Sequence, residues 1–123
     1  MGEIVAVALG GAVGSVGRYL TGLGMRALLP GLPAGTFVAN VVAGLVIGVV
    51  TGADLAAPLP ANVRLLLTVG LCGGLSTFST FSSETVQLVE AGNLPGAVLN
   101  VVLNVGVCLA AVAAGLRIGG AVA

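Results

Sequence analysis

The sequence predicts an all-α membrane protein, a single domain of four transmembrane helices over residues 1–123, with the third helix broken near its middle. Hydrophobic residues make up 58% of the chain and charged residues 7%, whereas an ordinary soluble domain has about 25% charged residues. The mean hydropathy is +1.22. Because each span needs about 20 residues, the length leaves no room for a soluble catalytic domain beside the lipid-embedded part.

The four basic and four acidic side chains divide the chain into its spans. The apolar stretches between them predict helices over Ile4–Leu28, Pro33–Thr51, Ala61–Val89 and Leu94–Arg117. The separators LPGLPAG, GADLAAPLP and EAGNLPG are rich in glycine and proline, as turns are. The first helix has an acidic flank, so we expect it to be retained rather than removed as a signal peptide. The expected location is the inner (plasma) membrane, with several spans in the lipid bilayer.

The arginines give little preference for one orientation. With both ends cytoplasmic, Arg64 and Arg117 lie inside and Arg26 lies outside, which is a weak bias under the positive-inside rule. A chain with so little bias can insert both ways and pair with an inverted copy of itself, so that two chains form an inverted repeat as an antiparallel dimer. A single fixed orientation explains the same charges equally well.

Small residues at helical spacing predict close contacts between helices. In a membrane such spacing lets two backbones approach closely. The positions are Gly10, Gly14 and Gly17 in the first helix, Gly44 and Gly48 in the second, and Gly115 and Gly119 in the fourth.

The third span contains the most informative stretch, GLCGGLSTFSTFSSE from Gly70 to Glu84. The adjacent Gly73 and Gly74 predict a break in the helix, which would free backbone carbonyls there. Unwound backbone is tolerated at membrane depth only where protein or a cavity satisfies it, and six hydroxyl side chains follow within ten residues of the break. The stretch therefore predicts a broken helix that lines a path for a small ion. A kink that serves only packing is the alternative.

Polar amides occur in the second and fourth spans. Asn40 is the strongly polar side chain inside the second, and Asn100, Asn104 and Cys108 recur every four residues, which places them on one face of the fourth. Amides and hydroxyls offer the N–H and O–H donors that an anion needs in place of water. For Asn40 the alternative is a hydrogen bond that holds two helices together.

Two aromatic and two charged side chains can each be interpreted in two ways. Phe78 and Phe81 share a helix face, where they either pack or turn their positive ring edges toward an anion. Arg18 lies deep in the first span, from which it either extends to the membrane surface or lines a polar vestibule with Glu84 as a partner. Glu84 is otherwise a helix-end charge.

Several functional classes are disfavoured by absences. The chain has no histidine, which removes the usual catalytic triad and most zinc sites, so no enzyme is expected. A proton-coupled multidrug exporter needs a membrane-embedded carboxylate, whereas Glu3 is terminal and Asp54 lies in a loop. Cys72 and Cys108 are read as small hydrophobes rather than as a disulfide.

Three segments carry a resemblance to a known family. GGAVGSVGRY from Gly10, GTFVANVVAG from Gly35 and GLCGGLSTFSTF from Gly70 resemble the signature segments of the CrcB/Fluc family of small fluoride channels. The resemblance spans all four helices and is strongest in the third. It implies four-helix subunits that assemble as antiparallel dual-topology dimers and export fluoride passively, which lowers its cytoplasmic concentration.

The resemblance also implies roles for individual residues. The fluoride pore would be formed by Asn40, Phe78, Ser79, Thr80, Phe81, Asn100, Asn104 and Cys108, and the vestibule by Arg18 and Glu84. The backbone carbonyls of Gly73 and Ser76 would hold a structural sodium ion at the dimer centre. The fourth helix departs from the family, which commonly has a tyrosine followed by serines where this chain has amides and a thiol. A heterodimer with a homologous subunit, in which this chain has the less active pore, is therefore an alternative, as is a small-solute or multidrug exporter.

Overall fold

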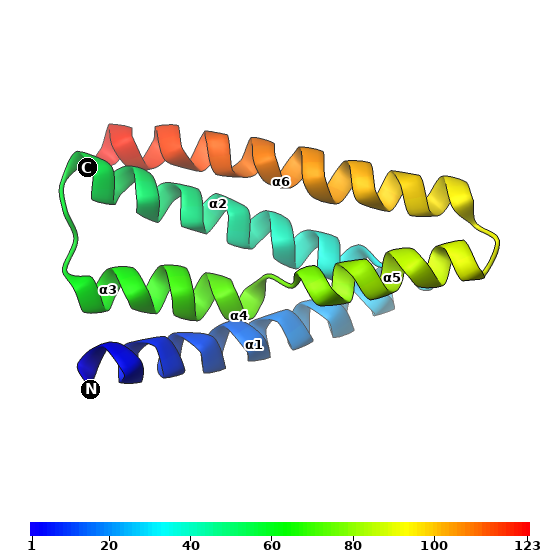
Figure 1. The fold of residues 1–123 in the computed structure, drawn as a ribbon, viewed down its shortest axis with the longest axis horizontal. Helices are drawn as coiled ribbons and strands as arrows, with labels where there is room; N and C mark the ends of the chain where they lie inside the picture. The colour runs from blue at the N-terminus through cyan, green and yellow to red at the C-terminus, as the bar shows by residue number, and fades with distance from the viewer.

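The structure is a computed structural model that describes all residues 1–123 and consists of helices joined by short turns (Figure 1). The elements are α1 (Gly2–Leu28), α2 (Ala34–Ala56), α3 (Ala61–Leu65), η1 (Leu66–Cys72), α4 (Gly73–Leu75), α5 (Phe78–Glu90) and α6 (Leu94–Val122). The elements from α3 to α5 follow one another along a single span, residues 61–90, so four segments are long and apolar enough to cross a membrane. The prediction of four spans is confirmed.

Two predicted boundaries are wrong. α2 continues to Ala56 instead of ending at Thr51, and α6 continues to Val122 instead of Arg117. Gly52 was expected to open a turn, but it is helical because its backbone packs on α6: a Cβ at this position would lie 3.0 Å from the backbone nitrogen of Gly120. A glycine at a helix contact and a glycine in a turn therefore look alike in the sequence.

The helix ends follow ordinary capping rules. Glu3 in the first turn of α1 and Arg26 in its last turn have the charges that the helix dipole favours. The side chain of Asn93 caps α6 by accepting a hydrogen bond from the Gly96 nitrogen at 3.0 Å. The two turns after α1 and α5 contain Gly31 and Gly92 with φ of 82° and 78°, a backbone conformation that glycine adopts without strain.

Glycines form two close helix contacts. Where α2 meets α6, a Cβ at Gly115 would lie 2.9 Å from the Cα of Gly48, and where α1 meets η1, a Cβ at Gly70 would lie 2.9 Å from the Cα of Gly10. The predicted contact roles are confirmed at Gly10, Gly14, Gly44, Gly48, Gly115 and Gly119, whereas Gly17 makes only an ordinary contact with the Leu75 side chain. Each contact fixes how closely the two helices that it joins approach each other.

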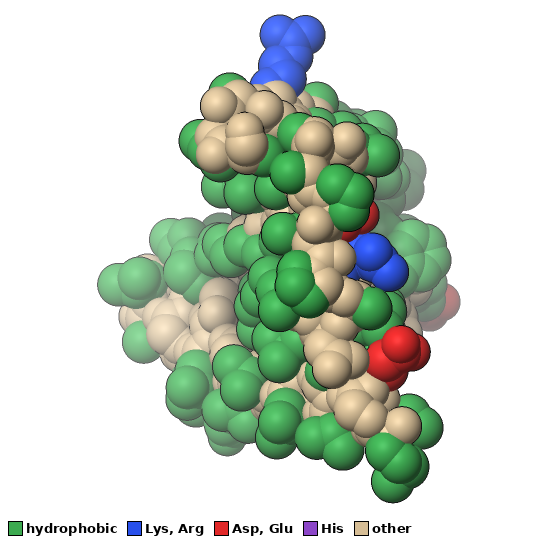
Figure 2. Space-filling view, turned by 90° about the vertical axis from the view of Figure 1, so that its left-hand side faces the viewer, with side chains coloured by type: hydrophobic (Ala, Val, Ile, Leu, Met, Phe, Trp, Pro, Cys, Tyr) green, Lys and Arg blue, Asp and Glu red, His purple; other side chains and the backbone are tan.

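The interior consists of small side chains and backbone. Only 17 of the 123 residues are buried, among them Ala6, Ala39, Ala43 and Ala97, and no large side chain is fully buried. Figure 2 views the end of the molecule where both termini lie, and it shows hydrophobic side chains over most of this end with few charged groups. An apolar exterior around a small-residue interior is the pattern of a multi-pass integral membrane protein.

The third span is broken, but not where the glycines predicted. Ser76 (φ −80°, ψ 155°) and Thr77 (φ −153°, ψ 115°) are extended, whereas Gly73 (φ −63°, ψ −36°) is helical. Gly74 serves packing, because a Cβ there would lie 2.6 Å from the carbonyl oxygen of Gly11. The break falls instead at two hydroxyl residues, whose side chains compete with the backbone for hydrogen bonds. In Figure 1 it is the short coil between α4 and α5.

Candidate functional site

The break is held by one side chain from another helix. Asn40 on α2 accepts a hydrogen bond from the Thr77 backbone nitrogen at 2.8 Å through its Oδ1, and its Nδ2 donates to the Thr77 carbonyl at 3.4 Å. The carboxamide therefore satisfies both backbone groups of Thr77, which the break removes from the helix. Of the two interpretations of Asn40, the interhelical hydrogen bond is present.

Asn40 is the first member of a hydrogen-bonded chain. Its Nδ2 donates to Asn104 Oδ1 at 3.2 Å, and Asn104 Nδ2 donates to the backbone carbonyl and to Oδ1 of Asn100 at 2.9 and 3.0 Å. Asn100 Nδ2 then donates to Thr85 Oγ1 at 3.0 Å, and the Thr85 hydroxyl donates to the Phe81 carbonyl at 2.8 Å. Asn100 and Asn104 are 8% and 5% exposed, so the face of α6 that carries these amides points inward. We call this series from Asn40 to Phe81 the amide chain.

A groove of about 350 Å³ lies beside the break. Its lining includes most of the predicted pore residues: Asn40, Phe78, Phe81, Asn104 and Cys108, together with Thr68, Cys72, Gly73, Ser76 and Thr77. The groove thus combines amides and hydroxyls with two aromatic rings and two thiols. The structure thus brings five of the predicted pore residues, from three spans, to one groove.

Three predicted pore residues do not line this groove. Ser79 is exposed on α5, and Thr80 lines a different cleft. Asn100 lies behind Asn104 and bonds to Thr85 rather than facing the groove. The spacing of four residues correctly places Asn100 on the same helix face as Asn104. The groove, however, reaches only the part of that face where Asn104 lies.

The two phenylalanines form a tilted pair. Their ring centroids are 5.5 Å apart and their planes meet at 56°, which lies between stacked and edge-to-face geometry. Phe81 is 8% exposed and fills the interior, whereas Phe78 is 78% exposed beside the groove. The pair therefore presents one free ring on the open side of the groove.

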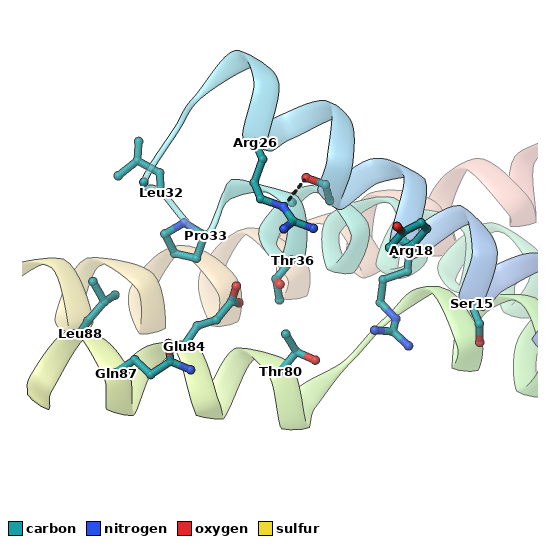
Figure 3. A pocket seen from close by; sticks show the side chains of 14 residues that line it. Ser15, Arg18, Arg26, Leu32, Pro33, Thr36, Thr80, Glu84, Gln87 and Leu88 are labelled. Carbon is teal, nitrogen blue, oxygen red and sulfur yellow. Dashed lines mark hydrogen bonds between the residues drawn. The ribbon is translucent and has the colours of Figure 1, made fainter. Parts of the chain in front are cut away.

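A polar cleft of about 700 Å³ lies between the C-terminal half of α1, the start of α2 and α5 (Figure 3). Only three of its 14 lining residues are hydrophobic, and the polar ones include Arg18, Arg26, Thr36, Thr80 and Glu84. Arg18 does not extend to the membrane surface: its Nε donates to the Gly74 carbonyl at 3.0 Å. Of the two interpretations of Arg18, lining a polar vestibule fits the structure.

Glu84 lines the same cleft, but it does not pair with Arg18. Its Oε1 is buried and has no hydrogen-bond partner, and the ion pair of the chain joins Arg64 and Asp54 at 3.6 Å instead. The predicted partnership is therefore wrong in this conformation, because the guanidinium of Arg18 is directed to the backbone of α4 (Figure 3). The cleft nonetheless contains two arginines and one carboxylate within a polar lining.

The break leaves two carbonyls without their helical donors. In a continuous helix the Thr77 N–H would donate to Gly73 and the Thr80 N–H to Ser76. Here Thr77 donates to Asn40, and Thr80 donates to Thr77 Oγ1 at 3.1 Å. No hydrogen bond reaches the carbonyl of Gly73 or of Ser76. The chain has no cluster of three acidic, histidine or cysteine residues that could hold a metal ion.

Two residues of the amide chain were not predicted as site residues. Thr77 is the N-cap of α5, and the pattern of a threonine before a helical segment could have identified it. Thr85 ends the amide chain, and its role has no local signal because it depends on how α5 and α6 face each other.

The fold and the groove define a small polytopic membrane protein with a groove of mixed polar and apolar lining beside a broken helix. The chain belongs to the family described as CrcB-like protein, Camphor Resistance (CrcB), whose profile matches residues 5–116. Three similar proteins carry the name fluoride-specific ion channel FluC. That of Paraburkholderia xenovorans is 46% identical over 108 residues, 87% of this chain and 86% of its own length.

The FluC of Pectobacterium atrosepticum is 44% identical over 102 residues, 82% of this chain and 80% of its own length. That of Methanocaldococcus jannaschii is 40% identical over 107 residues, 87% of this chain and 86% of its own length. The predicted family membership is therefore confirmed over nearly the whole chain, including the fourth helix, where the resemblance of individual motifs is weakest.

Proposed function

We propose that this chain forms a fluoride-selective channel in the inner membrane, through which fluoride leaves the cell passively. The observation that carries the proposal is the groove beside the break, where amide, hydroxyl and aromatic groups from three spans converge in a chain whose relatives are named fluoride-specific channels. Fluoride is small and strongly hydrated, so a path through lipid must replace its water with hydrogen-bond donors.

The start of α5 supports an anion path. α5 begins in the middle of the third span at Phe78, and its N-terminus lies at the groove. The N-terminus of a helix has a partial positive charge, and half-helices that start within a membrane use it toward anionic groups. The break thus directs a favourable backbone field toward the groove without placing a charged side chain there.

Phe78 and Phe81 complete the anion environment. Ring edges carry the positive part of the aromatic quadrupole, so a tilted pair can turn an edge toward fluoride. The large exposed fraction of Phe78 places one ring where an ion in the groove, or a second subunit, would meet it.

The polar cleft serves as the vestibule. Arg18 and Arg26 line it, and a recess lined by arginines raises the local concentration of anions. Thr80 and Glu84 on α5 lie in the same recess. Thr80 lies between the groove residues Phe78 and Phe81 in the sequence, and Glu84 follows Phe81 by about one helical turn. An anion that enters the cleft is therefore led toward the start of α5.

Gly73 and Ser76 would hold a sodium ion. Their carbonyl oxygens lose their helical donors at the break and are hard, neutral ligands, as Na⁺ prefers. Two carbonyls do not complete a coordination sphere, so the same two from a second chain would be needed. When bound, the ion would supply a positive charge at the centre of the assembly, which lowers the barrier for an anion nearby.

Two copies in opposite orientation form the proposed channel. The groove is open on the side of Phe78, and a second chain would close it. The weak arginine asymmetry permits both orientations. An antiparallel homodimer is the simplest assembly that satisfies both observations.

One observation favours a heterodimer in which this chain has the less active pore. Both N–H groups of Asn40 and both of Asn104 are engaged within the chain, so neither amide offers a free donor in this conformation. A homologous subunit with hydroxyls in the fourth helix would then provide the conducting path.

Efflux from liposomes that contain only this purified chain tests the proposal. We expect fluoride to leave and chloride to be largely retained, because short donors in a narrow path favour the smaller anion. Equal flux of the two anions would contradict the proposal. Fluoride efflux only after addition of a homologous subunit would favour the heterodimer.

A further inference from the structure

The amide chain runs in one direction, and backbone groups fix that direction. The Thr77 N–H can only donate, so it sets Oδ1 of Asn40 toward the break. The Asn100 carbonyl can only accept, so it sets Nδ2 of Asn104 toward α6. The Phe81 carbonyl likewise receives the Thr85 hydroxyl proton, which leaves Thr85 Oγ1 to accept from Asn100. For each carboxamide, only one of the two orientations that exchange the oxygen and the nitrogen is therefore compatible with these hydrogen bonds.

The two ends of the amide chain lie on the same segment. It starts at Thr77 in the break and ends at the Phe81 carbonyl, one turn into α5, so Phe78 lies between its ends. α5 contacts α6 moderately and α2 only slightly, whereas α2 and α6 pack along their length. The amide chain is thus the polar link that joins the first turns of α5 to the rigid pair formed by α2 and α6.

One donor in this arrangement is held more loosely than the others. Asn40 Nδ2 lies 3.2 Å from Asn104 Oδ1 but 3.4 Å from the Thr77 carbonyl, and the second distance is at the long end for a hydrogen bond. The N–H that donates to the Thr77 carbonyl is therefore the one that can most easily leave its acceptor and donate to an anion in the groove instead. Its aim depends on the other N–H remaining bound to Asn104.

We propose that Thr85 and Asn100, which do not line the groove, are positioning residues for fluoride passage. Thr85 holds Asn100, Asn100 holds Asn104, and Asn104 holds the Asn40 carboxamide so that one N–H faces the groove. The proposal rests on the proposed function, since fluoride is the ion whose passage the aimed donor serves.

The test compares Thr85→Val with Thr85→Ser in the full chain. Valine keeps the shape but removes the acceptor for Asn100 Nδ2, so we expect fluoride flux to fall at least about tenfold, whereas serine keeps the hydroxyl and should retain most of the flux. Thr21→Val is the matched control, because Thr21 also donates to a carbonyl four residues earlier, Gly17 at 2.8 Å, but belongs to no such chain. Equal losses in the valine and serine variants, or no loss in Thr85→Val, would overturn the proposal.

A spectroscopic measurement separates positioning from packing and does not depend on flux. The chain has five asparagines, so selective ¹⁵N labelling of their side chains gives few NMR signals to assign. We expect Thr85→Val to shift the side-chain amide signal of Asn40, two amides away, and Thr21→Val to leave it in place. An unchanged Asn40 signal in Thr85→Val would overturn the proposal even if flux falls. If the wild-type chain passes no fluoride either alone or with a homologous subunit, the proposed function fails, and this signal alone decides the positioning role.

Discussion

Asn40 and Thr77, 37 positions apart in the sequence, are joined by two hydrogen bonds that replace the missing helical bonds of the third span. The side-chain amide of Asn40 thus provides the acceptor and the donor that backbone peptide groups would provide in a continuous helix. The pairing makes a broken helix stable at membrane depth, where an unpaired backbone group would cost several kcal/mol. It also places the donor nitrogen of Asn40 beside Phe78.

Asn40→Asp should lower fluoride flux at least about tenfold. The carboxylate keeps an acceptor for the Thr77 N–H but loses both donors, and an ionised carboxylate also repels an anion. Stopped-flow or electrode measurement of fluoride efflux checks this result. Asn62→Asp, at the exposed start of α3, is the control and should conduct like the wild type. Normal flux in Asn40→Asp would assign Asn40 to packing alone.

Phe78→Ile and Phe81→Ile should each impair fluoride passage, because isoleucine removes the ring edge while keeping apolar bulk. Their effects on stability should differ: Phe81 is 8% exposed and Phe78 is 78% exposed, so only Phe81→Ile should destabilise the chain, by less than about 1.5 kcal/mol. Flux and thermal unfolding measured on the same preparations separate the two effects. Wild-type flux in both variants would show that the rings only pack.

Asn104→Leu should reduce flux far more than Asn104→Ser, since leucine has the branched shape and the number of side-chain heavy atoms of asparagine but has no donor. One donor lost to a charged species is worth roughly 1.5–3 kcal/mol, which corresponds to about ten- to a hundredfold in rate if that donor acts at the highest barrier. Indistinguishable flux for the two variants would show that the polar face of α6 is not a working part of the pore. The partner subunit would then be the source of conduction.

Removal of sodium should weaken the assembly. If the Gly73 and Ser76 carbonyls hold Na⁺, then exchange into a buffer with a large organic cation should lower both the dimer fraction and the flux, and added Na⁺ should restore both. Chromatography or single-molecule photobleaching in the two buffers measures the dimer fraction. A dimer that is equally stable without Na⁺ would remove the ion from the proposal.

Gly115→Ala should destabilise the chain, whereas Gly120→Ala should not. A Cβ at Gly115 would lie 2.5 Å from the Leu45 carbonyl oxygen, and α2 would have to move; a Cβ at Gly120, on the same helix, meets nothing within 4 Å. Alanine is favoured over glycine by up to about 1 kcal/mol in a helix, so Gly120→Ala should be neutral or slightly stabilising. Unfolding in denaturing detergent gives the comparison, and equal midpoints would contradict the close contact.

The sequence predicts the fold well because lipid restricts the options. Four apolar stretches between charged residues can only be four spans, and α1, α3 and α6 start within two residues of their predicted positions. The position of the break was missed because Gly73 is helical and Gly74 has a packing role, which looks the same as a kink in the sequence. The hydroxyl residues Ser76 and Thr77, which do form the break, resembled pore lining.

The site was predicted in part for a related reason. Helical spacing identifies which side chains share a face, and it correctly grouped Asn104 with Cys108 and Phe78 with Phe81. It does not give the rotation of one helix against another, on which the bond from Asn100 to Thr85 depends. Nor does it show that Arg18 binds a backbone carbonyl, because Gly74 presents no side chain that could indicate a partner.

An interior built from glycine, alanine and backbone changes which mutations the protein can tolerate. In a soluble domain the large buried side chains are the sensitive positions, but here most valines and leucines face outward and no large side chain is fully buried. Exchanges among apolar residues at those outward positions should be nearly silent in a saturation mutagenesis screen for fluoride resistance. The sensitive positions should be the glycines at helix contacts, so the map of tolerance would be the reverse of that for a globular protein in water.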